Sequence, residues 1–219
     1  MKAILFDLEG TLVETLYQWN PRAGNQFFNK IKKKLISLGV PGNILHGEIR
    51  SPQLRNRAFT WVENNMNQSE SIFFYDELNA FMKPFEMNSA IQAKLYPDTL
   101  ETLSKLNSRV IKIGIATNTS SEAANYILEN TGLKSYFEVI VTRNDVPRLK
   151  PDPAMIHKAI DMLGIVAEWL VGDTIVDVDA ATNAGLKSII IRRNGICPSF
   201  SHDFFVNSLK SITSIILND

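Results

Sequence analysis

The sequence has one cysteine, no excess of charge of either sign and no long apolar run. Cys197 has no second cysteine with which to form an internal disulfide, which is typical of chains from a reducing compartment. Lysine plus arginine number 23, as do aspartate plus glutamate, so no global field attracts nucleic acid or an anionic membrane. The apolar runs are too short for a signal peptide or a membrane span. We therefore expect a cytoplasmic protein that binds neither nucleic acid nor a membrane.

The composition is that of a globular protein with a sizeable core. Of the 219 residues, 45% are hydrophobic and 21% are charged, which argues against disorder. The chain is longer than one minimal domain and shorter than two full ones. We therefore predict one core domain with a large insertion.

Short apolar runs with strand character alternate with helical patterns along most of the chain. This alternation predicts an α/β fold with a Rossmann-like parallel sheet that is covered by helices on both faces. Asp98 with Glu101, and Thr119 with Glu122, match the capping-box pattern of a helix start. The predicted strands are Ala3 to Phe6, Ile111 to Ala116, Phe137 to Val141, Trp169 to Val171 and Ser188 to Ile191.

One connection departs from this alternation, because only helical patterns occur between about Thr15 and Asn88. Apolar residues recur at helical spacing before Gly39 and again before Pro84, which predicts helices that stop there. We interpret residues 15–87 as an inserted helical cap subdomain. Residues 1–14 and 88–219 then form the α/β core.

Three predicted strands end on polar or acidic residues: Asp7, the pair Thr117 and Asn118, and Asp173. Ligands of open parallel sheets bind beyond the carboxyl ends of the strands. Clustered carboxylates repel each other unless a cation or a shared proton compensates, and an all-oxygen set suits Mg²⁺. A helix beginning near Ser120 adds its free N–H groups at the same edge. These features together predict a site for a phosphoryl group.

Side-chain alternation places Asp7 and Glu9 on one side of the extended chain and Leu8 on the other, and Gly10 permits a tight turn after them. Lys150 lies in the loop segment RLKPDP, after another strand of the sheet. From the residues alone, a surface position and a role in the site are about equally favoured for Lys150.

These segments together resemble the haloacid dehalogenase superfamily, in its phosphoglycolate-phosphatase-like branch. The resemblance covers almost the whole predicted core, and the branch has a helical cap at the position of the predicted insertion. It implies a Mg²⁺-dependent phosphatase that forms an aspartyl-phosphate. The matching segments, in chain order, are DLEGTLVET, LYPDTLETLSKL, GIATNTSSEAANYILENTGLKSYFEVIVTRNDV, LKPDP and WLVGDTIVDVDAATNAGL.

The resemblance implies a role for each catalytic candidate. Asp7 matches the nucleophile that attacks phosphorus. Glu9 matches the acid that protonates the leaving alcohol and then activates water. Thr117, with Asn118, matches the phosphate-binding position. Lys150 matches the cation that offsets charge between nucleophile and phosphate.

The resemblance also implies a metal site and one further phosphate-binding residue. Asp173 matches a Mg²⁺ ligand, together with Asp7 and the backbone carbonyl of Glu9. Asp177 matches a residue that supports the water shell of the metal. Thr11, in the turn after the first strand, matches a phosphate-binding position.

Two positions depart from the branch. Glu9 stands where Asp is usual, which adds a methylene to the acid, and Leu149 stands where Gly commonly precedes the lysine. Three alternatives therefore stay open: a sugar-phosphate mutase, a 2-haloacid dehalogenase and a non-catalytic binding module. Glu9 and Asp173 weigh against the dehalogenase, because the metal-free dehalogenases have an aromatic residue at the position of Glu9 and do not need the acidic metal site.

The expected partner is a small phosphorylated metabolite, and the sequence sets no oligomeric state. Four arginines of the predicted cap offer positions for a second anionic group of such a molecule, although arginines on helix surfaces are usually solvated. They are Arg22, Arg50, Arg55 and Arg57.

Overall fold

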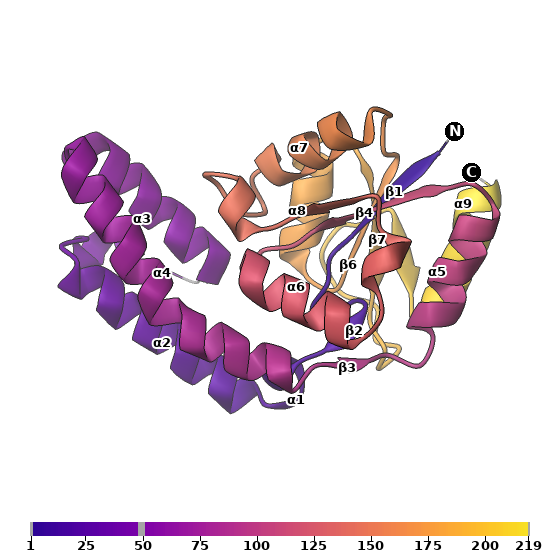
Figure 1. Cartoon of the computed structure of the whole chain (residues 1–219), viewed down its shortest axis with the longest axis horizontal. Coiled ribbons are helices and arrows are strands. Elements are labelled where there is room, and N and C mark those ends of the chain that lie inside the picture. The colour runs from indigo at the N-terminus through magenta and orange to yellow at the C-terminus, as the bar shows by residue number, and fades with distance from the viewer. Residues whose placement is uncertain (1, 48–50, 219) are drawn as a thin grey trace.

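The computed structural model describes residues 2–47 and 51–218, which contain a sheet of six parallel strands in the order β5-β4-β1-β6-β7-β8. This sheet confirms the predicted α/β fold class (Figure 1). Each predicted strand is present within one or two residues of its expected bounds. The strands are β1 (Ala3–Phe6), β4 (Lys112–Ala116), β5 (Val139–Val141), β6 (Trp169–Gly172), β7 (Lys187–Ile191) and β8 (Phe204–Val206).

Helices cover both faces of this sheet. Ile4 and Phe6 of β1 pack with α5, α6 and α9, whereas Ala3 and Leu5 pack with α7 and α8. The strand therefore buries side chains on both faces, as expected for a parallel sheet between two helical layers. The helices are α5 (Thr99–Ser108), α6 (Ser121–Asn130), α7 (Ala154–Leu163), α8 (Ile175–Asn183) and α9 (Ile212–Asn218).

The helices between β2 and β3 form a separate lobe beside the sheet (Figure 1). Their apolar faces make a core of their own, which includes Leu35, Leu54, Phe74 and Leu78. The interpretation of residues 15–87 as a cap subdomain stays a prediction. The lobe contains α1 (Leu16–Trp19), α2 (Pro21–Ser37), a 3₁₀ turn (Gly42–Leu45), α3 (Ser51–Asn65) and α4 (Gln68–Ile91).

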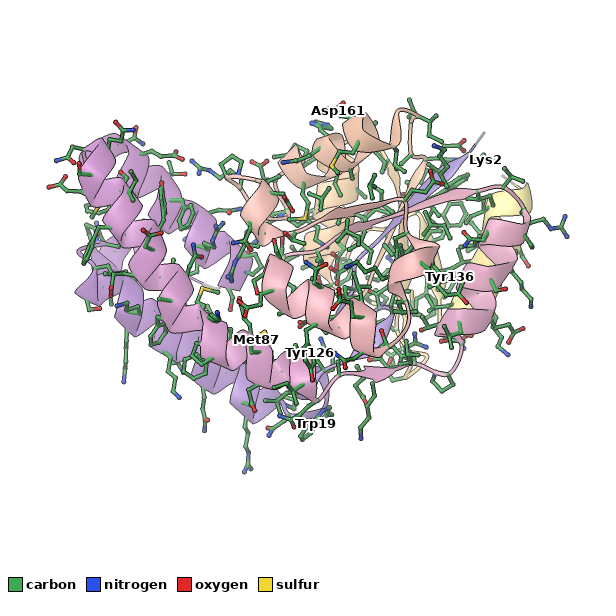
Figure 2. The ribbon with its side chains drawn as sticks, viewed as in Figure 1. Lys2, Trp19, Met87, Tyr126, Tyr136 and Asp161 are labelled. Carbon is green, nitrogen blue, oxygen red and sulfur yellow. The ribbon has the colours of Figure 1, made fainter. Side chains whose placement is uncertain are left out.

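The sequence predicts a helix that stops before Pro84. Helix α4 instead includes Pro84 and continues to Ile91. A proline inside a helix removes one backbone hydrogen bond. The turns that follow bury apolar side chains against the α/β core, which compensates for that loss. Met87 of α4 packs there beside α6, near Tyr126 (Figure 2). The helix thus crosses position 87, the expected end of the cap.

A short antiparallel ribbon lies where the chain leaves the core and where it returns. β2 (Val13–Glu14) pairs with β3 (Lys94–Leu95). The two connections between the lobe and the sheet therefore run side by side. In the described ranges, no helix is both long enough and apolar enough to cross a membrane.

Candidate active site

The central strands bring three predicted site segments together. β1 lies between β4 and β6, so Asp7, Thr117 and Asp173 follow three adjacent parallel strands. One cavity, of about 330 Å³, is lined by all three of these residues together with Lys150 and Asp177. The sequence prediction of a polar cluster at this edge of the sheet therefore agrees with the structure.

Lys150 is a buried member of this cluster and not a surface lysine. It is 1% exposed, and its Nζ donates to Asp7 Oδ1 at 2.8 Å and to Asp177 Oδ1 at 2.6 Å. Burial favours the neutral amine, but the carboxylates of Asp177 and Asp7 outweigh it and raise the pKa of Lys150. The ammonium therefore stays charged beside Asp7.

Asp7, Asp173 and Asp177 offer carboxylate oxygens that all lie within 4.8 Å of one another. Burial raises the pKa of Asp7 to about 6, although Lys150 opposes that rise. Burial, followed by the charges of Asp177 and Asp7, raises the pKa of Asp173 well above its usual range. One lysine does not balance three carboxylates, of which Asp7 and Asp177 are buried and Asp173 is half-buried. The cluster has the excess negative charge and the oxygen donors that fit a divalent cation such as Mg²⁺.

Two glycines allow this close packing of acids. A Cβ atom at Gly10 would collide with the carboxylate of Asp173, and Gly10 also has a φ of +83°, which disfavours other residues. A Cβ atom at Gly172 would collide with the side chain of Asp177. Substitution at either position would displace a member of the cluster.

Glu9 lines the same cavity as the cluster but has different partners. Thr15 Oγ1 donates to Glu9 Oε2 at 3.3 Å. Burial, followed by the charges of Asp7 and Glu86, raises the pKa of Glu9 to about 7, against the opposing effect of hydroxyl hydrogen bonds. Glu9 therefore carries a proton in a substantial fraction of molecules at neutral pH.

The predicted phosphate-binding residues lie in different surroundings. Thr117 is buried beside Thr119, whose N–H donates to Thr117 Oγ1 at 3.3 Å. The Asn118 side chain holds the backbone of Lys150: its Oδ1 accepts from the Lys150 N–H at 3.0 Å, and its Nδ2 donates to the Lys150 carbonyl at 3.3 Å. Thr11 is fully buried and outside the lining of the Asp7 cavity, and its Oγ1 lacks a hydrogen-bond partner among the described residues.

Asn56 of α3 makes a second clamp on the lysine loop, which the sequence analysis missed. Its Nδ2 donates to the Leu149 carbonyl at 2.7 Å, and its Oδ1 accepts from the Leu149 N–H at 2.8 Å. The two asparagines thus fix consecutive residues, with Leu149 held from the lobe and Lys150 from the core. No spacing or motif around Asn56 signals this contact.

A second cavity, of about 260 Å³, lies between the lobe and the core. Its walls include Arg55, Glu86 and Arg143, of which the sequence analysis missed the last two. Arg143 follows β5 and binds both carboxylate oxygens of Glu86, with Nη2 to Oε2 at 3.0 Å. The two cavities share the lining residues Glu9, Tyr17, Ser51, Pro52, Asn118 and Thr119, so they adjoin each other.

Comparisons with known proteins agree with this arrangement. The chain is 27% identical to a phosphoglycolate phosphatase of Aquifex aeolicus over 92% of both chains. It is also 24% identical to the pyrophosphatase PpaX of Bacillus cereus, in a match that covers 100% of this chain and 97% of that protein. Among solved structures, a HAD phosphatase of Thermococcus onnurineus superposes with a TM-score of 0.60 at 26% identity, covering 99% of this chain and 98% of that one.

The sequence model of one family extends over most of this chain. It matches residues 1–185, which include both connections to the lobe and all the acids of the cluster. Since the match covers well over half of the sequence and the parallel sheet agrees with it, the chain belongs to the haloacid dehalogenase-like hydrolases.

Proposed function

We propose that this hydrolase is a Mg²⁺-dependent phosphatase that removes the phosphate from a small phosphorylated metabolite through an aspartyl-phosphate on Asp7. The observation that carries the proposal is the Asp7 carboxylate, held at 2.8 Å from a buried lysine within a cluster of acids. Relatives named phosphoglycolate phosphatase and pyrophosphatase support phosphate as the reacting group. A cytoplasmic location belongs to the same proposal and is supported by the single cysteine.

In the first step, a carboxylate oxygen of Asp7 attacks phosphorus in line with the leaving oxygen. The new bond joins Asp7 to phosphorus, and the ester bond to the alcohol oxygen breaks. Lys150 offsets the charge of the transferring group, and Thr117 donates to its oxygens. Protonated Glu9 gives its proton to the alcohol oxygen, a role that suits a carboxyl whose pKa is raised to about 7.

In the second step, Glu9 changes from acid to base, and Asp7 changes from nucleophile to leaving group. Glu9, now a carboxylate, takes a proton from a water molecule as the water oxygen attacks phosphorus. The bond between phosphorus and Asp7 breaks, inorganic phosphate leaves, and both acids return to their starting states. Glu9 and Asp173 weigh against haloacid chemistry, which does not need a second acid or a metal site.

The acids of the cluster form the proposed metal site. Asp7 and Asp173 would hold Mg²⁺ with the backbone carbonyl of Glu9. Asp177, which accepts hydrogen bonds from Lys150 and from Thr174 Oγ1 at 2.7 Å, would orient a water of the metal shell. Bound Mg²⁺ supplies positive charge that neutralises both the acids and the phosphate.

The test is phosphate release from a panel of esters that includes phosphoglycolate, pyrophosphate and an aryl phosphate, in Mg²⁺ and in EDTA. We expect release in Mg²⁺ from at least one member, its loss in EDTA, and its loss in a folded Asp7→Asn variant. Undiminished turnover in Asp7→Asn would contradict the proposed nucleophile. Undiminished turnover in EDTA would contradict the metal site.

A further inference from the structure

Arg55 of α3 is a buried cation with unmet hydrogen-bonding capacity. It is 6% exposed, and its Nε and Nη1 have no hydrogen-bond partner within the part of the chain that the structure describes. Its guanidinium lies 3.8 Å from the ring centre of Phe59, which supports the cation without pairing it. Leaving a buried donor unpaired is costly, so such a group indicates a partner that comes from outside the protein.

Two arginines line this cavity, and Arg55 is the one whose charge is not paired with a carboxylate among the described residues. Arg143 is also buried, but it is paired with Glu86, so the two charges offset each other. Burial, followed by repulsion from Arg143, lowers the pKa of Arg55 to about 9, and the side chain therefore stays charged at neutral pH. An anion that enters this cavity would meet a cation without a carboxylate partner among the described residues. A small turn of the guanidinium would bring the unpaired Nε and Nη1 donors to it, because both atoms are covered in this structure.

The position of the cavity identifies which part of a substrate would enter it. Asp7 lies in the adjoining cavity, and Glu9 lines both. In the proposed reaction, Glu9 protonates the oxygen that leaves phosphorus. The organic part of the substrate begins at that oxygen and extends past Glu9, toward the cavity of Arg55. A volume of about 260 Å³ admits only a small group.

We propose that Arg55 binds a second anionic group, a carboxylate or a phosphate, on the leaving-group side of the substrate. The substrates would then be small phosphate esters with two anionic ends. The inference rests on the proposed phosphatase function. Of the four cap arginines singled out from the sequence, Arg22 and Arg57 are exposed, Arg57 donates to the His46 carbonyl, and Arg50 lies outside the described residues.

Three matched compounds test this proposal. Phosphoglycolate has a carboxylate at its second end, ethylene glycol monophosphate has a neutral hydroxyl there, and ethylene glycol bisphosphate has a phosphate. We expect the wild-type kcat/KM for one of the two compounds with an anionic second end to exceed that for the compound with the neutral end by about tenfold or more. This factor is the contribution of a charge-assisted hydrogen bond. The preferred compound identifies the anion as a carboxylate or a phosphate.

Two variants and one control assign this preference to Arg55. In Arg55→Met, the ratio of kcat/KM between the anionic and neutral compounds should fall by about 10- to 100-fold. Arg55→Lys keeps the charge and should retain part of the ratio. Arg57→Met removes an exposed arginine of the same helix and should leave the ratio unchanged. Thermal unfolding midpoints establish that each variant is folded. If Arg55→Met does not fold, the ratio of kcat/KM in Arg55→Lys, compared with wild type, tests the role of Arg55.

Equal wild-type rates on all three compounds, or a wild-type ratio that survives in Arg55→Met, would overturn the subsite. Failure of the phosphatase proposal gives a different result, which is no phosphate release from any ester. In that case calorimetric binding of the same three compounds in Mg²⁺ decides the matter. Tighter binding of an anionic-ended compound that is lost in Arg55→Met supports the subsite, and equal binding of all three contradicts it.

Discussion

Two carboxylates that are two residues apart differ in their partners. Asp7 has the Lys150 ammonium at 2.8 Å, which opposes the effect of burial and keeps its pKa at about 6. The hydroxyls of Thr119 and Thr15 only partly oppose the effect of burial on Glu9, and its pKa rises to about 7. The partner of Asp7 is a cation and the partner of Glu9 is a hydroxyl, a difference that suits Asp7 to attack and Glu9 to move protons.

The first prediction concerns the proton carried by Glu9. Because the proposed first step needs protonated Glu9, kcat/KM should fall as the pH rises above about 7, the raised pKa of this acid. In Glu9→Gln, kcat should drop by about 10²- to 10⁴-fold, and the residual activity should no longer fall as the pH rises through this range. Rate profiles against pH measure both effects.

Glu14→Gln is the matched control for Glu9→Gln. Glu14 lies in β2, five residues further along the chain and outside the lining of both cavities. Its substitution should preserve the rate and the pH profile. A Glu9→Gln variant with wild-type turnover would remove the acid and base role from Glu9.

Sequence reasoning at the residue scale worked where a strand end fixed the position. Asp7 and Asp173 follow adjacent parallel strands, so their meeting could be predicted from topology. Arg143 and Glu86 could not, because their contact joins a loop to a helix that was expected to end earlier. Asp98 is the N-cap residue of α5, as expected, but it forms no capping box with Glu101, because its carboxylate bonds other segments. At the next helix, Ser120 and not Thr119 is the N-cap.

At the scale of elements, α3 links the lobe to the loop that carries Lys150. Two consecutive residues of this helix make the link: Arg55 lines the cavity between the lobe and the core, and Asn56 holds the backbone of Leu149. The residue after Leu149 is the lysine that contacts Asp7. Movement of α3 relative to the core would therefore alter both the cavity and the loop that positions Lys150.

The second prediction tests the clamp made by Asn56. In Asn56→Ala, the N–H and carbonyl of Leu149 lose their partners, and the loop that carries Lys150 becomes less well held. We expect kcat/KM to fall by about tenfold, which corresponds to roughly one net hydrogen bond, while Mg²⁺ dependence persists. Steady-state kinetics on a phosphate ester measure this loss.

Asn64 of the same helix provides the control for this clamp. Among the residues that the structure describes, its side chain bonds only within α3, donating to the Thr60 carbonyl at 2.8 Å. Asn64→Ala should therefore leave kcat/KM close to wild type. Equal effects of the two variants would indicate a general weakening of α3 and contradict a specific clamp.

Elements that differ from the sequence prediction have few local signals. β8 (Phe204–Val206) is only three residues long and half buried, at the edge of the sheet, so it lacks the apolar run of the inner strands. The extension of α4 beyond Pro84 depends on packing against the core, which local propensity does not include. Strands with a buried apolar run could be predicted even when short. A half-buried edge strand and a helix end that depends on tertiary packing could not.

At the scale of the whole molecule, Asp98 joins distant parts of the core. Its carboxylate accepts from Arg193 Nη1 at 2.9 Å, from Ser208 Oγ at 2.7 Å and from the Leu209 N–H at 2.8 Å. Arg193 also donates to the Thr11 carbonyl, in the turn that follows β1. This network therefore connects the C-terminal segment to the loop that carries Gly10.

The third prediction concerns stability against acid. Burial alone would raise the pKa of Asp98, but the bonds from Ser208, Leu209 and Arg193 lower it below the ordinary 3.8. The ionised form therefore stabilises the fold fully above about pH 3.8, and this contribution is lost as the pH falls through the lower folded-state pKa. Asp98→Asn should reduce the free energy of unfolding at pH 7 by about 2–3 kcal/mol.

Denaturant unfolding at several pH values measures this difference. The gap between wild type and Asp98→Asn should narrow below pH 3.8, whereas a control at the exposed Asp161 of α7 should show little effect at any pH (Figure 2). A gap of constant size down to the acid limit would contradict a role for the ionised carboxylate.

The aspartyl-phosphate on Asp7 is tested most directly by trapping it. Wild-type protein is mixed with its best phosphate ester in Mg²⁺, quenched in acid during turnover and digested, and the peptide that contains Asp7 is examined by mass spectrometry. We predict a phosphoryl adduct on Asp7 that forms before steady state, decays when substrate is exhausted and is absent from Asp7→Asn. Rapid turnover with Asp7 unmodified throughout, or with the phosphoryl group on another residue, would contradict the account.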